Sequence, residues 1–162
     1  MREMRRKDRE LSPELALRIL KENNHGVLSL VLPDGTPYGV PLNYGFDQSQ
    51  IIMHAALVGL KMDAIANHPR GCFTVIHKAE VDSANLQTFY ASAMAFGPLE
   101  VITDPVEKRA YLIKLLAHYH ISELDAQKAL EVDTPYTSVI VHSIEQLRAK
   151  GYANLFENRP AK

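Results

Sequence analysis

Residues 38–69, YGVPLNYGFDQSQIIMHAALVGLKMDAIANHP, decide the fold of this chain. Alternation in the first part of this stretch predicts a strand with one bulky face and one bare face. The bulky face carries Tyr38, Val40, Leu42 and Tyr44, and the bare face carries Gly39, Pro41, Asn43 and Gly45. Pro41 has no N–H group for a sheet ladder, and the glycines let a flat ligand approach the backbone. The bare face therefore indicates either a ligand wall or a kinked edge strand of a barrel.

A second strand and a short helix complete the stretch. Residues 50–56 alternate as a strand with His54 near its end, and Gly59 precedes a helix predicted over about residues 60–67. Lys61 falls in the first helical turn, where a cation is disfavoured by about 0.3–1 kcal/mol and an anion binds well. A bound phosphate would resolve this conflict. The alternatives are a solvated Lys61 and a His54 imidazole that only fills the core.

Turn and capping residues organise the rest of the chain. Asp34-Gly35 predicts a tight hairpin, and Ser12-Pro13 and Asp104-Pro105 predict helix starts. The helix after Asp104 is expected to bury Leu112, Leu115, Leu116 and Tyr119, and a shorter one is expected over 122–130. The six expected strands cover residues 26–32, 38–45, 50–56, 72–76, 88–102 and 137–151. The polar residues 78–87 are expected to be a connection.

This order of elements predicts an α+β fold, a small closed or split β-barrel with peripheral helices. A length of 162 residues fits one domain over 1–162, with an N-terminal arm at 1–11 and a tail at 152–162. The net charge of −1 argues against a nucleic-acid surface. The single Cys72 excludes an internal disulfide and is expected to act as a small buried hydrophobe. No apolar run of membrane-spanning length occurs, so a cytoplasmic protein is expected.

Reactive motifs are few. His118 and His120 lie two positions apart near Glu123, but such a pair does not share a helix face, so no metal site is predicted. The sequence has no glycine-rich dinucleotide motif, phosphate loop or nucleophile elbow. No catalytic acid or base is identified.

Four segments resemble, in order and spacing, the FMN-binding split-barrel proteins related to pyridoxamine 5'-phosphate oxidase. They read RRKDREL, GVLSLVLPDGTPYGVPLNYGFD, IIMHAALVGLKMDAIANHPRGCFTVI and YASAMAFGPLEVITDPVEKRAYL. The most specific parts are PYGVPLNY and the H-A-A-x-x-G-x-K run that ends at Lys61. The resemblance covers about residues 5–150, and within the superfamily the chain looks most like the 5-nitroimidazole-resistance (Nim) branch.

The resemblance implies a homodimer of six-stranded antiparallel split barrels with FMN sites at the subunit interface. Carried onto this sequence, the ring would be lined by Val40, Pro41, Leu42 and Asn43. His54 and Lys61 would lie near the ribityl phosphate, with Lys61 as the main counter-charge. Ser92 would approach the same site or the partner's site. Small residues are expected to leave space above the ring, namely Gly39, Gly45, Ala55 and Ala56.

Two functions follow from this resemblance. The first is an FMN-dependent oxidoreductase that reduces a small aromatic or nitro-aromatic acceptor, since the flavin carries the electrons and needs no dedicated acid or base. Oxidation of vitamin B6 is disfavoured. Such oxidases hold the substrate phosphate with an arginine and histidine pair near the C-terminus, and this chain offers only Arg148 there. The alternative is a flavin- or haem-binding module without turnover, in which His54, His118 or His120 would be the axial ligand.

Overall fold

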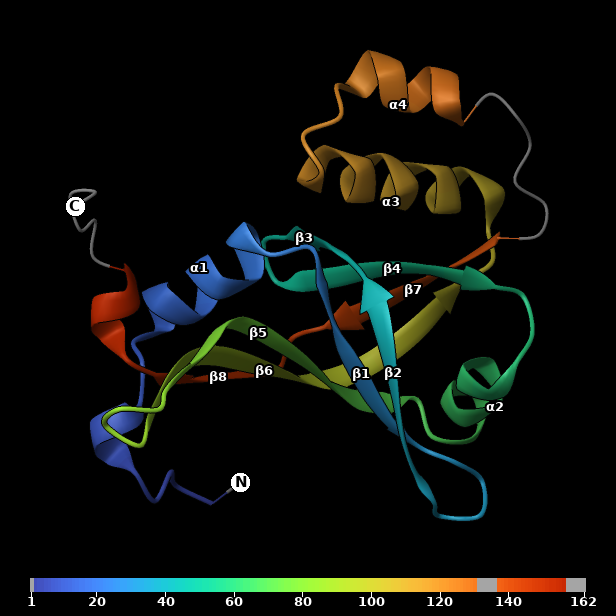
Figure 1. Ribbon diagram of the computed structural model, residues 1–162. Coiled ribbons are helices and arrows are strands. Elements are labelled where there is room, and N and C mark those ends of the chain that lie inside the picture. The colour runs from blue at the N-terminus through green and yellow to red at the C-terminus, as the bar shows by residue number, and fades with distance from the viewer. Residues whose placement is uncertain (1, 131–136, 157–162) are drawn as a thin grey trace.

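The computed structural model describes residues 2–130 and 137–156. Within these residues the chain forms eight strands, four α-helices and two short 3-10 helices (Figure 1). In chain order they are η1 (Lys7–Arg9), α1 (Pro13–Glu22), β1 (His25–Val31), β2 (Pro37–Asn43), β3 (Gly45–Asp47), β4 (Gln50–Ala56), α2 (Leu60–Asn67), β5 (Arg70–Asp82), β6 (Gln87–Ile102), α3 (Pro105–His118), α4 (Glu123–Ala129), β7 (Thr137–Ser143), β8 (Gln146–Gly151) and η2 (Ala153–Phe156).

The strands form one antiparallel sheet that curls without closing. Its order is β2-β1-β5-β6-β7-β4-β3, and β8 pairs with β6 beside this path. The first part of β6 pairs with β5 and β8, whereas its last residues, Leu99 to Ile102, pair with β7. One long strand therefore belongs to both halves of the barrel. The predicted α+β split-barrel class is confirmed.

Two hydrophobic clusters stabilise this sheet. The larger cluster fills the barrel and includes Ile51, Met53 and Ile140. The smaller cluster lies between α3 and the outside of β4 and β7, and consists of Ile52, Ile102, Leu112, Leu115, Val139 and Val141. Because side chains alternate along a strand, β4 and β7 supply both clusters at once. The predicted buried face of α3 is confirmed, with Leu116 and Tyr119 partly buried at its margin.

Helices α1 and α2 pack their buried residues into the same barrel cluster, from opposite sides of the molecule (Figure 1). In α1 these residues are Ala16, Ile19 and Leu20, and in α2 they are Ala64 and Ile65. The predicted cap of α1 is present, since Ser12 Oγ accepts a hydrogen bond from the Leu15 N–H at 3.3 Å. The hydroxyl of Tyr44, a fully buried residue, donates to the Leu20 carbonyl at 2.8 Å and so ties α1 to the strands.

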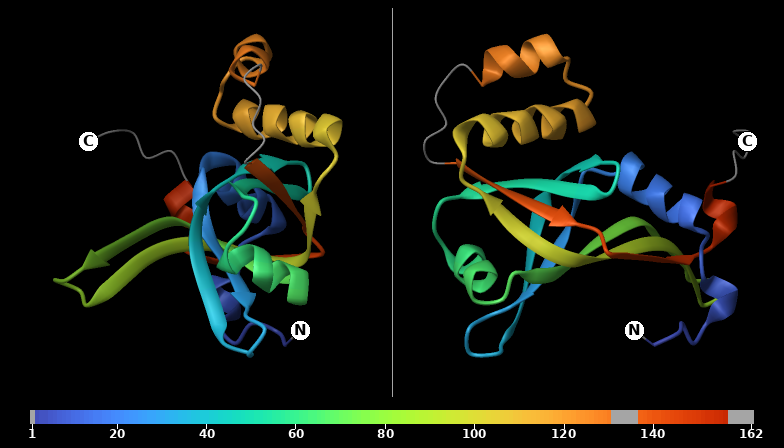
Figure 2. Two further views of the ribbon diagram at one scale, coloured as in Figure 1. Left: turned by 90° about the vertical axis from the view of Figure 1, so that its right-hand side faces the viewer. Right: turned by 180° about the vertical axis from the view of Figure 1, so that it is seen from behind.

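The predicted number of six strands is wrong, because the described residues form eight. The two additional strands are β3, which forms at Gly45–Asp47, and β8, which is separate from β7 within the range 137–151. A first error in the predicted bounds is the polar stretch 78–87, expected to be a connection. There β5 continues to Asp82 and pairs with β6 down to Gln87, after a bulge between Ile76 and Lys78. Charged and polar side chains are tolerated in this part because the hairpin extends away from the barrel into solvent (Figure 2).

The second error is the single strand predicted over 137–151. It is divided at Ile144-Glu145, where the Ile144 N–H donates to the Ser49 carbonyl and the Glu145 N–H donates to the Phe96 carbonyl, each at 2.9 Å. β7 before the break pairs with β4, and β8 after it pairs with β6. The apolar pattern of residues 137–151 does not reveal this break, because the strands that pair with its two halves come from distant parts of the chain.

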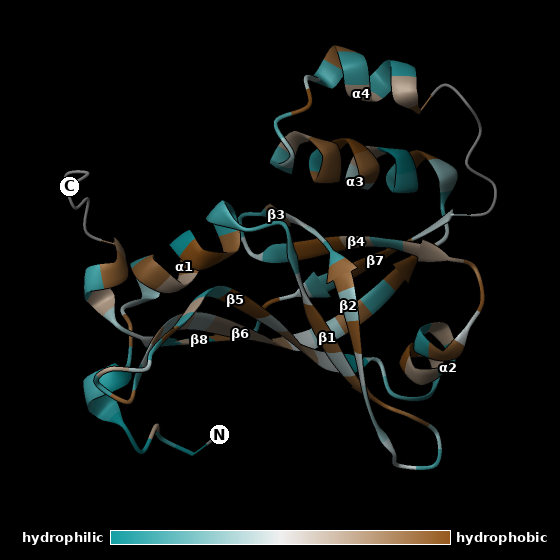
Figure 3. Cartoon of the chain, viewed as in Figure 1, coloured by the Kyte–Doolittle hydropathy of each residue, from teal (hydrophilic) through white to brown (hydrophobic). Residues whose placement is uncertain are grey.

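The N-terminal segment lies along β8 of the same chain. The Leu11 N–H donates to the Ala149 carbonyl at 3.1 Å, and Glu10 forms an isolated bridge with Lys150. Near it, the Arg9 guanidinium lies 3.6 Å from the centre of the Tyr152 ring. This segment and much of α4 are hydrophilic, whereas β4 carries hydrophobic residues (Figure 3). None of the described helices is long and apolar enough to cross a membrane.

A histidine is enclosed in the barrel. His142 on β7 is fully buried, its strand partners are Ile51 and Leu99, and neither ring nitrogen has a hydrogen-bond partner among the described residues. Burial lowers the pKa of His142 to about 4, the Gly97 backbone offsets part of this effect, and the Arg70 cation adds to it. His142 is therefore a neutral core residue near pH 7.

We expect His142 to make the fold acid-labile. Because its pKa is lower in the folded protein than its ordinary value of 6.5, the unfolded chain binds the proton first. Stability is then complete above about pH 6.5 and falls by about 3 kcal/mol as the pH approaches 4. Urea unfolding of His142→Leu should show a weaker decline above about pH 4.5, where most carboxylates are still ionised. His68→Gln, at an exposed position, is the matched control, and parallel curves for His142→Leu and the parent chain would contradict the assignment.

Candidate functional site

β2 presents the bare face that its sequence predicts. Gly39, Pro41 and Asn43 are exposed, whereas Val40 and Leu42 are partly buried and pack against the barrel core. β2 ends the strand order, as expected for a strand that contains Pro41. The side chains of Val40 and Leu42 therefore face inward, and their backbone is the part that remains available to a ligand.

β4 carries His54 to the surface just before the chain turns toward α2. Met53 and Ala55 on either side are buried, whereas His54 is exposed. Neighbouring atoms still cover part of the ring, and this desolvation lowers the pKa of His54 below its ordinary value of 6.5. The Lys61 cation lowers it further. The structure thus brings the His54 imidazole and the Lys61 ammonium into one electrostatic environment.

Lys61 occupies the first turn of α2, as predicted. It is partly exposed and forms no ion pair within residues 2–130 and 137–156. The N-cap residue Gly59 has φ 126° and no side chain caps the helix. Nothing lies within 4 Å of the position that a Cβ of Gly59 would occupy, so a ligand can approach this turn closely. Asp63 in the same turn is exposed and offsets part of the Lys61 charge.

The predicted space beside the ring is only partly present. Gly39 and Ala56 are exposed, but the prediction is wrong for Gly45 and Ala55. A Cβ on Gly45 would lie 2.7 Å from the Cα of Leu115, so the glycine allows α3 to pack against β3. Ala55 belongs to the barrel core. Their small size serves packing.

Ser92 lies on the outward side of β6, opposite Ile76 of β5 and Lys150 of β8. Two strands, β1 and β5, separate β6 from β2. At about 4.8 Å per strand, Ser92 is roughly 14 Å from β2 across the sheet. Within one chain, the structure therefore places Ser92 apart from the bare face of β2.

An apolar rim beside His54 and Lys61 escaped the sequence analysis. Leu57 and Val58 precede Gly59 in the β4–α2 connection, Leu60 follows it as the first residue of α2, and Val58 is 81% exposed. Three apolar residues around a glycine at the predicted helix start were the available signal. Exposed apolar residues next to an unpaired cation are typical of a site that accepts a ligand with an apolar and an anionic part.

The other candidate ligands are engaged or isolated. His118 Nε2 lies 2.7 Å from the Asn23 carbonyl oxygen, and His120 is exposed in a turn beyond α3. No cluster of three metal-ligating side chains occurs in the part of the chain that the structure describes. Cys72 is half-buried beside Thr74, and burial raises the pKa of its thiol, as expected for an unreactive cysteine.

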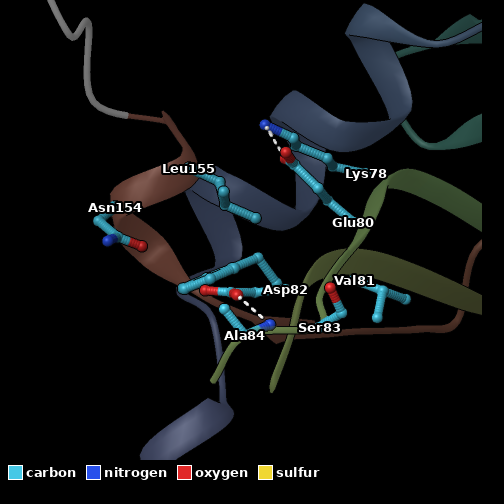
Figure 4. A pocket seen from close by; sticks show the side chains of 9 residues that line it. Lys78, Glu80, Val81, Asp82, Ser83, Ala84, Asn154 and Leu155 are labelled. Carbon is cyan, nitrogen blue, oxygen red and sulfur yellow. Dashed lines mark hydrogen bonds and ion pairs between the residues drawn. The ribbon is translucent and has the colours of Figure 1, made fainter. Parts of the chain in front are cut away.

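A cavity of about 640 Å³ lies elsewhere, between the tip of the β5–β6 hairpin and η2 (Figure 4). Its charged residues bind one another or their own loop. Lys78 pairs with Glu80 at 3.0 Å, and Asp82 accepts hydrogen bonds from the Ala84 and Asn85 N–H groups. No histidine or cysteine lines it. None of the predicted site residues on β2, β4, α2 and β6 lines this cavity.

Comparison with protein families places these residues in context. The model of the pyridoxamine 5'-phosphate oxidase family matches residues 12–144. The chain belongs to this family. The matched range includes the bare face of β2, His54, Lys61 and Ser92. A search of curated proteins found no match.

Several bacterial proteins of known structure share the fold of this member of the pyridoxamine 5'-phosphate oxidase family. A candidate 5-nitroimidazole antibiotic resistance protein of Bacteroides thetaiotaomicron has a TM-score of 0.70 at 20% identity, covering 87% of this chain and 85% of that one. A FAD-binding protein of Mesorhizobium loti has a TM-score of 0.62 at 21% identity, covering 90% and 98%. A FAD and haem binding protein of Mycobacterium smegmatis has a TM-score of 0.72 at 22% identity, covering 88% and 72%. At these identities the similarity establishes the fold.

Proposed function

We propose that this protein is an FMN-dependent oxidoreductase that reduces a small aromatic or nitro-aromatic acceptor. One observation carries the proposal: in a member of the pyridoxamine 5'-phosphate oxidase family, an unpaired Lys61 at an uncapped helix start lies beside His54 and an apolar rim. This combination suits a ligand that has a phosphate at one end and a flat apolar ring at the other.

The residues present fit the phosphate end of FMN. Lys61 supplies a cation, the start of α2 supplies the positive end of a helix dipole, and Gly59 leaves the approach open. Hydrogen bonds between charged partners of this kind are about twice as strong as neutral ones. A single cation at one helix start matches the single phosphate of FMN.

The residues also fit the ring. Pro41 and Asn43 are exposed on β2, and the backbone of Val40 and Leu42 is accessible on the same edge strand. A bound flavin supplies hydride or electron transfer. The protein's own part is to hold the ring against the β2 backbone, to neutralise the phosphate through Lys61, and to exclude water with the apolar rim.

Resemblance to nitroimidazole-resistance proteins supports the acceptor class. The Bacteroides structure named for that resistance shares the fold over most of both chains. On this chain, Gly39 and Ala56 leave the exposed sides of β2 and β4 without bulky side chains. A flat aromatic acceptor can therefore lie close to the backbone there.

A homodimer would complete the site. The outward side of the sheet runs without interruption across five strands through Pro41, Val27, Thr74, Met94 and Arg148. On this side Ile76 is 58% exposed and Val31 is 43% exposed. Packing of two such faces would bury these residues and bring Ser92 of one chain toward the β2 strand of the other. The site would then lie at the subunit interface.

The second candidate is a flavin- or haem-binding module without turnover, favoured by the Mycobacterium smegmatis structure, whose name includes both ligands. His54 is the exposed imidazole of the site and is the candidate axial ligand. His118 is less suited, because its Nε2 contacts the Asn23 carbonyl oxygen.

Absorption spectroscopy and anaerobic reduction test the proposal. The purified protein should be yellow and release FMN on acid precipitation, and reduced nicotinamide should bleach the flavin until a nitroimidazole reoxidises it. A Soret band would favour the haem module instead. Bound flavin that neither donor nor acceptor affects would favour a carrier, and a chain that takes up neither cofactor would exclude both functions.

The dimer proposal predicts that Ile76→Glu weakens self-association. A buried carboxylate on the outward face would raise the dimer dissociation constant by at least about tenfold, because it replaces apolar burial by charge desolvation. Sedimentation equilibrium over a range of protein concentrations measures this shift. Val106→Glu, at an exposed position on α3, is the control. Equal association of the two variants would remove the outward face as the interface.

Lys61→Ala should weaken FMN binding by about 1.5 kcal/mol or more, the size of a charge-assisted hydrogen bond. Riboflavin, which has no phosphate, should bind the variant as well as it binds the parent chain. Quenching of flavin fluorescence measures both affinities. Lys128→Ala on the exposed side of α4 serves as the control. An unchanged affinity for FMN would show that the phosphate binds elsewhere.

A further inference from the structure

We propose that His54 takes up a proton when a phosphorylated flavin binds beside Lys61, so that loading of the cofactor is coupled to pH. The inference rests on the proposed function, because it needs a phosphate at Lys61. It concerns a property of the binding step itself and is independent of which acceptor the enzyme reduces.

His54 and Lys61 flank the same short connection between β4 and α2. His54 leaves β4 on its exposed side, Lys61 leaves the first turn of α2, and Gly59 between them has empty space on its side-chain side. The rim residues Leu57 and Val58 are exposed over the same connection. A phosphate that contacts Lys61 and the start of α2 therefore comes within the electrostatic reach of the imidazole.

The charges around His54 favour its neutral form before binding. Partial desolvation and the Lys61 cation both lower the pKa of the imidazole. Val139 is the strand partner of His54 on β7, and Lys114 of α3 is held by Asp47 of β3 at 2.8 Å. Asp63 of α2 is exposed in the turn of Lys61.

Binding of a phosphate dianion reverses this balance. The local charge near the imidazole changes from the single positive charge of Lys61 to a net negative charge, which favours the imidazolium form. An imidazolium also offers two N–H donors, whereas a neutral imidazole offers one and leaves a lone pair. The bound state therefore holds a proton at a ring nitrogen of His54 that the free state lacks at neutral pH.

Thermodynamic linkage between proton binding and ligand binding gives the direction in which pH changes the affinity for FMN. A ligand whose bound state carries one more proton binds more tightly as the pH falls, by at most tenfold per pH unit. The FMN phosphate works in the opposite direction, because its own second pKa near 6 removes the dianion in acid. The effect of His54 is therefore clearest between about pH 8 and about pH 6.5, where the dianion still predominates.

The test compares FMN with riboflavin, which shares the ring and lacks the phosphate. From about pH 8 to about pH 6.5, the ratio of FMN affinity to riboflavin affinity should rise about threefold or more in the parent chain. In His54→Gln the ratio should stay level or fall. His68→Gln, at the exposed C-cap of α2, should behave as the parent chain does. NMR titration of the His54 imidazole should show its pKa rising when FMN is added and staying in place with riboflavin.

The outcomes separate this inference from the proposed function. If FMN binds more tightly than riboflavin through Lys61 but the ratio is level with pH, or rises equally in His54→Gln, the proton uptake is overturned and the phosphate site stands. If FMN binds no more tightly than riboflavin at any pH, the phosphate site and the proton uptake are both overturned.

Discussion

The long strand β6 is the constraint on which the rest of the structure depends. Its first part pairs with β5 and β8, and its last residues pair with β7, so a single backbone fixes the angle between the two halves of the sheet. β7 in turn aligns β4 along its full length. The position of His54, and of the turn that leads to Lys61, is therefore set by strand pairing far from the site.

Because of that alignment, β4 contributes side chains to both hydrophobic clusters. Ile51 and Met53 face the barrel interior, while Ile52 between them faces α3. A strand buried on both sides over its first residues has its register fixed twice, because a slip by one residue would exchange both sets. His54 and Ala56 are exposed on the α3-facing side of the strand, just beyond Ile52. The candidate site therefore lies just beyond the part of β4 that is buried on both sides.

Local signals predicted the parts of the fold that local chemistry decides. Ser12 and Asp104 cap their helices, Gly35 forms the hairpin turn, and the alternation of β2 gives its bare face. The break at Ile144-Glu145 depended on partners distant in sequence, which periodicity cannot report. The pairing of residues 78–82 with 87–91 is a local hairpin, but its polar residues show no apolar alternation. In the site, the closeness of His54 and Lys61 followed from a short connection, whereas the role of Gly45 required the position of α3.

Two imidazoles of this protein, one fully buried and one exposed, show why position matters more than residue type. His142 and His54 both have a pKa lowered by desolvation. His142 faces Ile51 and Leu99, so no ligand can compensate a charge there and a proton can only destabilise the barrel. His54 is exposed near the Lys61 cation, so an incoming anion can compensate its charge. The same desolvation therefore makes protonation of His142 destabilising in acid, and it leaves His54 able to couple its protonation to ligand binding.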